Sequence, residues 1–421
     1  MRRYSAAQES MYILTMKRSG TADLPLHYGR VPEWLHSRMT AIGREIIRAL
    51  VLQAGPSEVL RRLSDPFWFQ ALGSVMGMDW HSSGITTSVM GALKRAVNPL
   101  YSELGLWICG GRGKHSLQTP SELLAFSDRT GCDGTTLVRA SKLSAKVDNT
   151  CIDDGFSLYL HSFIVSKNGE WAVIQQGMNP SVRRARRYHW HSSTVRSFVD
   201  DPHTAVIGEN IGEIMNLSDA RAEQNRQGIV EFLSQHPDVQ LREMRHLSLD
   251  ADHAVRPKQV DAKRLGAVMA LAYEKQFRNF TDALLLPGVG PRTVQSLALV
   301  SEVIYGAPGR FSDPARFAFA HGGKDGHPFP VPLKTYDESI AVLRNAVDAA
   351  SLDRSDKLRS LKILHRMSLS IENNCSPFAD VDKVIEFERR QSHRYGGMTV
   401  SGPAHPLPQQ PDAQQLDLFD T

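Results

Sequence analysis

Short apolar runs of strand length stand out in the first half of the chain. They occupy residues 105–110, 156–166 and 170–177 and are rich in Ile, Val, Phe and Trp, the residue types that favour strands. The last two runs are separated by a turn that contains Asn168 and Gly169, a dipeptide typical of β-hairpins. The pattern therefore predicts one strand followed, later in the chain, by a β-hairpin.

Apolar residues recur at helical spacing on both sides of these runs. Two serines precede one such stretch, as a helix cap would. From Asp219 onward the pattern is almost entirely helical. Helices are expected at residues 32–63, 82–97, 219–235, 261–277, 291–305, 335–350 and 383–391.

This order of elements predicts an N-terminal domain of the α+β or α/β class, followed by an all-α domain and a disordered C-terminal tail. We assign residues 1–15 to an N-terminal extension, 16–205 to the α/β domain, 206–392 to the helical domain and 393–421 to the tail. The tail is rich in proline, glutamine and small residues, a composition that cannot build a core.

The composition changes this outline little. It is 41% hydrophobic and 22% charged, as in globular proteins, and the net charge of +4 permits a nucleic-acid partner without requiring one. The four cysteines lie far apart and form no CxxC pair, so neither a disulfide framework nor a zinc ribbon is indicated. No stretch of about 18 apolar residues is present that would span a membrane. We expect a cytoplasmic protein with no membrane partner.

The clearest motif is "ALLLPGVGPRTVQSLALV", from Ala283 to Val300. Its two glycines allow a sharp turn, and Pro291 stands at the favoured first position of the second helix. The N–H groups at that helix start can bind an anion. The motif resembles the helix-hairpin-helix element of DNA repair proteins, which implies contact with the DNA backbone without base reading. An ordinary helix–turn–helix corner is the alternative. The residues assigned to DNA are Gly288, Val289, Gly290, Arg292 and Thr293.

Some relatives of this hairpin are DNA glycosylases with a catalytic aspartate after it. The corresponding acid here is Asp313, and the second helix contains no lysine. A glycosylase-like activity is therefore a further alternative, and the hairpin is interpreted mainly as a DNA-binding element.

Residues 146–191 concentrate acids, histidines and arginines. Four arginines occur within five positions, which suits phosphate binding, with a solvated surface as the alternative. These are Arg183, Arg184, Arg186 and Arg187. The same block offers candidates for two kinds of phosphodiester chemistry, and a β-hairpin with a hydrogen-bonded structural histidine is the third interpretation.

The first chemistry is metal-assisted hydrolysis. Asp154 precedes one strand, and Glu170 and Gln176 belong to the next. Acids at strand ends can hold Mg²⁺ or Mn²⁺, which activates water and stabilises the charge on phosphorus. We predict Asp154 and Glu170 as the metal ligands on this route.

The second chemistry is covalent. The segment "HSFIVSKNGEWAVIQQGMN" is similar to the hairpin of the phospholipase D superfamily, in which a histidine is followed by a turn and then by Gly-x-Asn. The resemblance implies that His161 is a nucleophile, that Gly177 and Asn179 close the motif, and that no metal is needed. Two copies of His161 would then meet across a homodimer axis.

A third phosphate candidate is "ICGGRGKHS". Its glycine pair follows a predicted strand and precedes Arg112, Lys114 and Ser116, which could surround a phosphate group. The spacing is not that of a nucleotide-binding P-loop.

Several strings together resemble one known family. These are "KRSGTADLPLHYGRVPEWL", "GGRGK", "WAVIQQGMN" and "ARRYHW". They are similar to the family catalogued as domain of unknown function 763, over residues 16–395. The resemblance implies that residues 146–191 are a family signature, but it implies no activity.

The chain ends in "QLDLF", from Gln415 to Phe419. This is similar to the pentapeptide that bacterial replication and repair proteins insert into the sliding clamp. The resemblance implies that Gln415 binds the rim of the clamp pocket while Leu416, Leu418 and Phe419 enter it. Folding back onto the body as a structural latch is the alternative.

The sequence therefore predicts a nucleoid-associated protein of DNA repair or replication. We expect it to bind DNA, to be a candidate nuclease or phosphodiesterase, and to be recruited by the sliding clamp. A non-enzymatic DNA-binding accessory factor is the alternative.

Overall fold

The computed structural model of the chain describes residues 31–78, 83–208, 210–246, 262–275, 279–315 and 333–374, together with Arg390 and two short strands near the C-terminus. Residues Arg18–Ser376 form one compact unit, and Met1–Lys17 with Pro377–Thr421 form the other. In the second unit, β6 (Met398–Thr399) pairs antiparallel with β7 (Gly402–Pro403). The predicted disorder of the tail stays a prediction.

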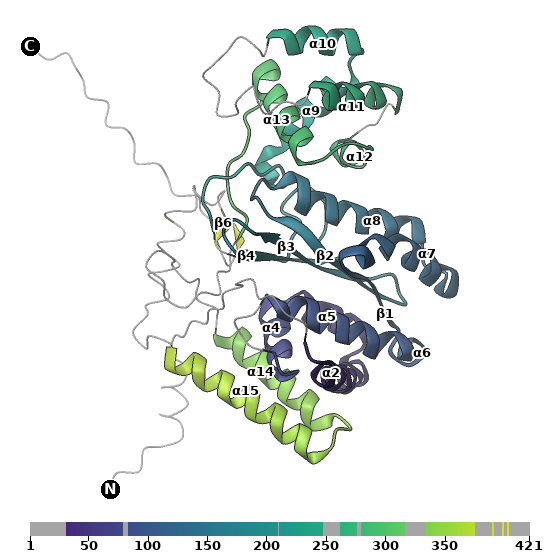
Figure 1. The fold of residues 1–421 in the computed structure, drawn as a ribbon, viewed down its shortest axis with the longest axis vertical. Helices are drawn as coiled ribbons and strands as arrows, with labels where there is room; N and C mark the ends of the chain where they lie inside the picture. Colours follow the sequence, from purple (N-terminus) through teal and green to yellow (C-terminus); the bar gives the residue numbers. More distant parts are fainter. Residues whose placement is uncertain are drawn as a thin grey trace, which may run out of the picture. The chain divides into compact units, whose positions relative to one another are not determined.

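A five-stranded antiparallel sheet is the centre of the larger unit (Figure 1). Its strands lie side by side in chain order, so each strand pairs with the one that precedes it. The strands are β1 (Leu106–Arg112), β2 (Ser157–Ser166), β3 (Trp171–Asn179), β4 (Arg184–His191) and β5 (Ala205–Ile207). The predicted strand and β-hairpin are confirmed as β1, β2 and β3.

Helices cover both faces of the sheet, because alternate side chains of each strand point to opposite sides. On one face, Phe163, Val173 and Trp190 share a core with the helices that follow β1 and β5. These are α7 (Thr119–Thr130), α8 (Gly134–Lys146), α9 (Glu223–Ser234), α11 (Ala262–Lys275), α12 (Phe280–Leu284) and α13 (Pro291–Tyr305). Helix α10 (Pro237–His246) packs against α11.

On the other face, Ile164 and Ile174 share a core with helices from both ends of the unit. The N-terminal members are α2 (Glu33–Ala54), α3 (Pro56–Ser64), α4 (Pro66–Val75) and α5 (Gly84–Val97). The C-terminal members are α14 (Leu333–Ala349) and α15 (Arg354–Asn374), which pack against α2 and α4 (Figure 1).

Short helical turns complete the unit. They are η1 (Asn98–Leu100), α6 (Tyr101–Leu104), η2 (Gly113–Gln118), the π-helical turn η3 (Val147–Cys151) and η4 (Ala220–Ala222).

The fold is thus mixed α/β with an antiparallel sheet, as the sequence predicts in outline. An all-α domain after residue 205 is not separate in the structure, because α9 and α13 share a core with the sheet and α14 shares one with α2. The boundary near residue 205 stays a prediction. Two strands are not predicted by the sequence pattern, β4 and the short β5. The arginine-rich segment that we interpreted as a phosphate-binding surface is β4, with the buried residues that a central strand requires.

The glycine-rich motif "ICGGRGKHS" places β1 directly against β2. Gly110 pairs with Ser162, and a Cβ atom at Gly110 would lie 2.3 Å from His161 O and 2.5 Å from Thr119 Oγ1. Its φ of +80° is also unfavourable for other residues. Only glycine therefore fits between β2 and the start of α7.

We expect Gly110→Ala to lower the free energy of unfolding by about 3 kcal/mol, from overpacking and backbone strain together. Gly113→Ala is the matched control. Gly113 has a positive φ of +58°, but no described atom lies within 4 Å of its Cβ position, so only backbone strain of about 1 kcal/mol is expected. Urea unfolding of both variants measures the difference. Equal losses would mean that β1 does not pack against β2 as closely as described.

Candidate active site

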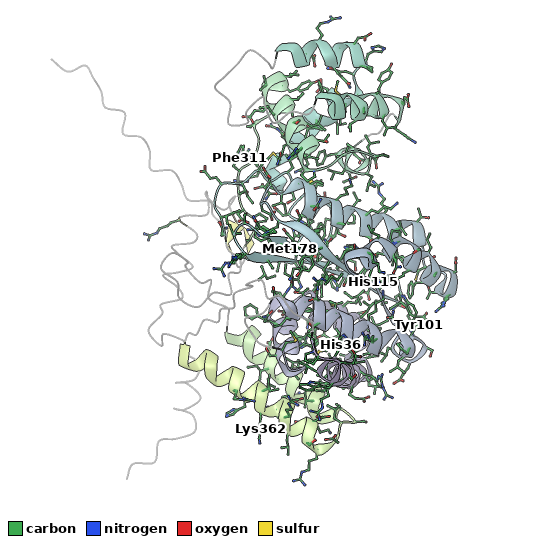
Figure 2. All side chains as sticks on the ribbon, viewed as in Figure 1. His36, Tyr101, His115, Met178, Phe311 and Lys362 are labelled. Carbon is green, nitrogen blue, oxygen red and sulfur yellow. The ribbon has the colours of Figure 1, made fainter. Side chains whose placement is uncertain are left out.

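Three of the sequence motifs meet at one cavity of about 600 Å³. Its wall is formed mainly by α8, the turn η2, the first half of β2 and the loop that joins α12 to α13. Ser116 comes from the glycine-rich motif, His161 from the β-hairpin, and residues 285–290 from the helix-hairpin-helix motif. His115, labelled in Figure 2, lies in the same η2 turn as Ser116.

The loop between α12 and α13 has the backbone that its sequence predicts. Gly288 has a φ of +86°, and Gly290 is the extended residue that precedes α13. Val289 is buried in the core, and its N–H donates to Leu286 O at 3.3 Å. Because Gly290 has no side chain, no side chain among the described residues caps the N-terminus of α13. Pro291 has no N–H, and Val294 N–H donates to Gly290 O at 3.0 Å, so the N–H groups of Arg292 and Thr293 are the ones that the first turn can offer to a ligand.

Two of the residues assigned to DNA turn inward instead. Thr293 is buried, and its hydroxyl donates to Gly288 O at 3.4 Å, so it closes the loop. Val289 supports the loop from the core. Gly288 and Arg292 are exposed. The surface that could meet a ligand is therefore made by the glycine backbone, the start of α13 and Arg292.

Helix α8 fixes this loop beside the sheet. Lys146 Nζ donates to Val289 O at 2.5 Å, and Arg139 Nη2 donates to Asp282 Oδ1 at 2.6 Å. Lys142 and Lys146 both line the cavity. Two lysines beside a helix N-terminus make this wall of the cavity favourable for an anion.

His161 lies on β2 in the wall of the cavity and is only 6% exposed. Its Nε2 lies 2.8 Å from Ser141 Oγ on α8, and its Nδ1 lies 2.9 Å from Gln175 Oε1 on β3. Burial lowers the pKa of His161 to about 4, so the imidazole is neutral at pH 7.

The polar contacts continue behind His161. Gln175 Nε2 donates to Asp148 Oδ2 at 2.5 Å, and Trp190 Nε1 donates to the same oxygen at 2.9 Å. The other oxygen, Asp148 Oδ1, lies 2.5 Å from His203 Nε2. Asp148 is fully buried in the π-helical turn η3 that follows α8, and burial raises the pKa of its carboxyl group. A connected line of polar side chains therefore runs from Asp148 to the cavity.

The two predicted metal ligands do not come together. Glu170 lies in the turn before β3, where its carboxylate accepts a hydrogen bond from Ser57. Asp154 precedes β2 and lies near the other end of the hairpin, which Met178 marks in Figure 2. Asp154 precedes Ser157 at one end of β2, and Glu170 lies beside Ser166 at the other end, nine residues or roughly 30 Å away at 3.3 Å per residue. One ion cannot bind both carboxylates, so a metal site made by this pair is wrong.

Asp154 instead belongs to a buried ion-pair cluster. Its Oδ2 accepts hydrogen bonds from Arg186 Nη1 at 2.9 Å and from Tyr188 OH at 2.7 Å. Asp313 binds the same guanidinium with both oxygens, at 3.0 and 2.7 Å. Burial raises the pKa of Asp154. Neither carboxylate is available to a substrate, so Asp313 does not fit the role of a glycosylase aspartate.

The predicted phospholipase D-like constellation does not form within the described chain either. Gln175 contacts His161, whereas Asn179 lies four residues further along β3 and accepts hydrogen bonds from Ser181. Gln176 points to the opposite face, where its amide donates to Ser83 O at 3.0 Å and to Tyr159 OH at 2.5 Å. The homodimer that would pair two copies of His161 stays a prediction.

The four arginines separate into two classes because β4 is a central strand. Arg183 is exposed and Arg184 is half-buried. Arg186 and Arg187 are 0% exposed, with Arg187 donating to Thr86 Oγ1 at 2.8 Å and to Gln70 Oε1 at 2.9 Å. The prediction that Arg186 and Arg187 contact DNA is wrong, because both guanidinium groups lie inside the fold.

The remaining predicted residues, Gln415, Leu416, Leu418 and Phe419, lie outside the described residues. The residues that sequence reasoning missed are Ser141 and Gln175, the two partners of His161. Ser141 was hidden in an ordinary amphipathic helix. The one available signal was a serine at a position where the spacing of α8 calls for an apolar residue.

No group of three or more His, Cys, Asp or Glu side chains in the described part could hold a metal ion. None of the described helices has both the length and the apolar composition for a membrane span.

We expect Arg186→Met to lower the free energy of unfolding by about 3–5 kcal/mol, because Asp154 and Asp313 would lose the buried cation that compensates them. Arg183→Met, which removes an exposed arginine three residues earlier, just before β4 begins, should change stability by less than about 0.5 kcal/mol. Urea unfolding at pH 7 measures both. A stable Arg186→Met variant would contradict the ion-pair assignment.

Comparison with known proteins gives one family. A family model described as "Protein of unknown function (DUF763)" matches residues 20–331. Neither the curated proteins nor the solved structures contained a match to the chain. The matched segment includes the whole sheet, the cavity residues Ser141 and His161, and the loop at residues 285–290. Because the match covers well over half of its residues, the chain belongs to the DUF763 family.

Proposed function

We propose that this protein binds DNA by its backbone and hydrolyses phosphodiester bonds in the cavity beneath the α12–α13 loop. The observation that carries the proposal is the convergence of three motifs on one cavity: the glycine-rich turn, the His161 strand and the helix-hairpin-helix loop. The sequence of each motif, taken alone, indicates binding of a phosphate group or chemistry on one.

The chemistry of the wall supports an anionic ligand. The uncapped N-terminus of α13 offers backbone N–H groups, and Lys142, Lys146 and the exposed Arg292 add positive charge near it. Such groups recognise phosphate by charge and hydrogen bonding, independently of the base sequence. The protein is therefore expected to bind DNA with little sequence preference and with an affinity that falls as salt rises.

His161 and its neighbours in the cavity wall support a reaction as well as binding. His161 is neutral at pH 7 and lies within hydrogen-bond distance of a hydroxyl group that faces the same cavity. A neutral imidazole beside a hydroxyl group is a common acid–base arrangement. Metal assistance from Asp154 and Glu170 is not part of this proposal, because the two carboxylates lie apart.

A non-enzymatic DNA-binding accessory factor is the second candidate. It is favoured by one observation: both ring nitrogens of His161 already have partners within the fold. Incubation with labelled single-stranded, duplex and flapped DNA, with and without magnesium, separates the two candidates. Binding without cleavage under every condition favours the accessory factor.

Recruitment by the sliding clamp belongs to the same proposal. It is supported by "QLDLF" at residues 415–419, which follows a proline- and glutamine-rich stretch. Two leucines and a phenylalanine could bury apolar surface in a preformed groove. A micromolar interaction, about −8 kcal/mol, is reasonable for such a peptide. Binding to the clamp would keep the protein close to DNA in the nucleoid.

We expect Gly290→Asp to weaken DNA binding at least tenfold, about 1.4 kcal/mol, because the carboxylate would occupy the place of a phosphate. Gly306→Asp is the matched control. It adds the same charge at the C-terminal end of α13, where a Cβ atom meets no described atom within 4 Å. That end is roughly 22 Å away along the helix. Fluorescence anisotropy with a labelled duplex at low salt measures both affinities. Equal affinity of the two variants would remove the loop from the DNA-binding surface.

We expect truncation after Gln410 to abolish capture by purified clamp and to leave the melting temperature unchanged. Leu418→Ala with Phe419→Ala should have the same effect, because both apolar anchors are lost. Asp417→Ala, at the position that the pentapeptide leaves variable, is the control and should bind as the parent does. A truncation that lowers the melting temperature by several degrees, with no clamp binding by the parent, would identify the segment as a structural latch instead.

A further inference from the structure

Ser141 is the hydrogen-bond partner of His161 at the Nε2 atom of the imidazole ring. The serine lies on α8 and the histidine on β2, and both line the cavity. Their polar atoms, Ser141 Oγ and His161 Nε2, lie 2.8 Å apart. This contact is separate from the residues that we assigned to DNA contact. The proposed function uses the hydroxyl group as a neighbour of His161 but assigns it no bond-forming step.

The donors and acceptors behind His161 determine its tautomer. Trp190 Nε1 can only donate, so Asp148 Oδ2 acts as an acceptor. Gln175 therefore presents its NH₂ group to Asp148 and its carbonyl oxygen to His161. An amide oxygen can only accept, so His161 Nδ1 carries the proton. His161 Nε2 then has a lone pair, and the Ser141 hydroxyl donates to it.

We propose that Ser141 is the nucleophile of this cavity, that His161 is its general base, and that Gln175 is a positioning residue that holds the imidazole in the required tautomer. Asp148 orients Gln175 in turn and is also a positioning residue. A serine, a histidine and a hydrogen-bond acceptor on the far nitrogen form the arrangement by which many unrelated enzymes activate a hydroxyl group.

The substrate class, a phosphodiester, rests on the proposed function. Ser141 Oγ would attack phosphorus while its proton passes to His161 Nε2. The bond from phosphorus to one ester oxygen breaks, and that oxygen leaves as an alcohol after taking the proton from His161. Water, deprotonated by His161, then attacks the phosphoserine diester, and Ser141 Oγ leaves and regains its proton. The sum is a phosphodiester plus water giving a phosphomonoester and an alcohol.

The surroundings of Ser141 fit this substrate better than a neutral ester. Lys142 follows Ser141 directly, Lys146 lies one further turn along α8, and both line the same cavity. The α12–α13 loop at residues 285–290 lines the same cavity, and Lys146 Nζ donates to its Val289 O. Positive charge beside the attacking oxygen stabilises the negative charge that develops on phosphorus.

The inference is tested with the full-length protein and a fluorescent fluorophosphonate, which reacts with an activated serine by loss of fluoride. We expect a single adduct, located on Ser141 by peptide mass spectrometry. Ser141→Ala should reduce labelling at least about 10³-fold. Ser144→Ala is the matched control, because Ser144 is also buried on the same helix but is absent from the cavity wall, and it should label as the parent does.

The positioning role of Gln175 is tested by the tautomer of His161, which a residue that only fills space would not change. In the parent protein, ¹⁵N NMR of labelled histidines should show His161 with a protonated Nδ1 and an unprotonated Nε2. Gln175→Met should remove that tautomer preference and reduce labelling roughly 10²-fold while the protein stays folded. An unchanged tautomer and unchanged labelling in this variant would overturn the role of Gln175.

The experiments distinguish failure of Ser141 as the nucleophile from failure of the proposed function on DNA. Labelling of Ser141→Ala equal to the parent, or an adduct on another serine, would overturn the nucleophile even if DNA binding is intact. A Ser141 adduct in a protein that binds no DNA would support the nucleophile and overturn the proposed function. Loss of DNA cleavage in Ser141→Ala, with DNA affinity unchanged, would support both.

Discussion

The architecture depends on one buried guanidinium. Arg186 on β4 binds Asp154, which precedes β2, and Asp313, which follows α13, and all three side chains are inaccessible to solvent. An unpaired buried charge costs several kcal/mol, so these three segments must meet whenever the protein is folded. The contact connects the segment after α13 to the sheet, and the hairpin loop at the other end of α13 then reaches the cavity beside α8.

A second buried network depends on the same arrangement. Asp148, Gln175 and His161 lie in a line across one face of the sheet and end at Ser141. Each buried polar group would be costly without its partner, so the line is rigid once formed. The polar network and the α12–α13 loop reach the cavity from different elements. That geometry is why we favour a reaction site over a binding surface alone.

Strand alternation explains why charged residues of one short segment have different roles. Arg186 and Tyr188 point toward the face that contains Asp154, whereas Arg187 points toward Gln70 and Thr86 on the other face. Arg183, which precedes the strand, remains exposed. Composition alone favours phosphate binding for all four arginines, because it carries no information about which side chains the neighbouring helices cover.

The sequence by itself determined the local elements. Helical spacing predicted α5 and α13, Asn168 and Gly169 predicted the turn between β2 and β3, and the glycines around Val289 predicted the hairpin loop. These features depend on residues that are close in the chain, which is why a pattern can reveal them. Only the tertiary structure decided that Ser141, His161 and the loop at residues 285–290 share one cavity, and that Asp154 and Glu170 do not share a metal. Those neighbours are set by the packing of helices on a sheet, which brings together residues more than a hundred positions apart and leaves no trace in their local spacing.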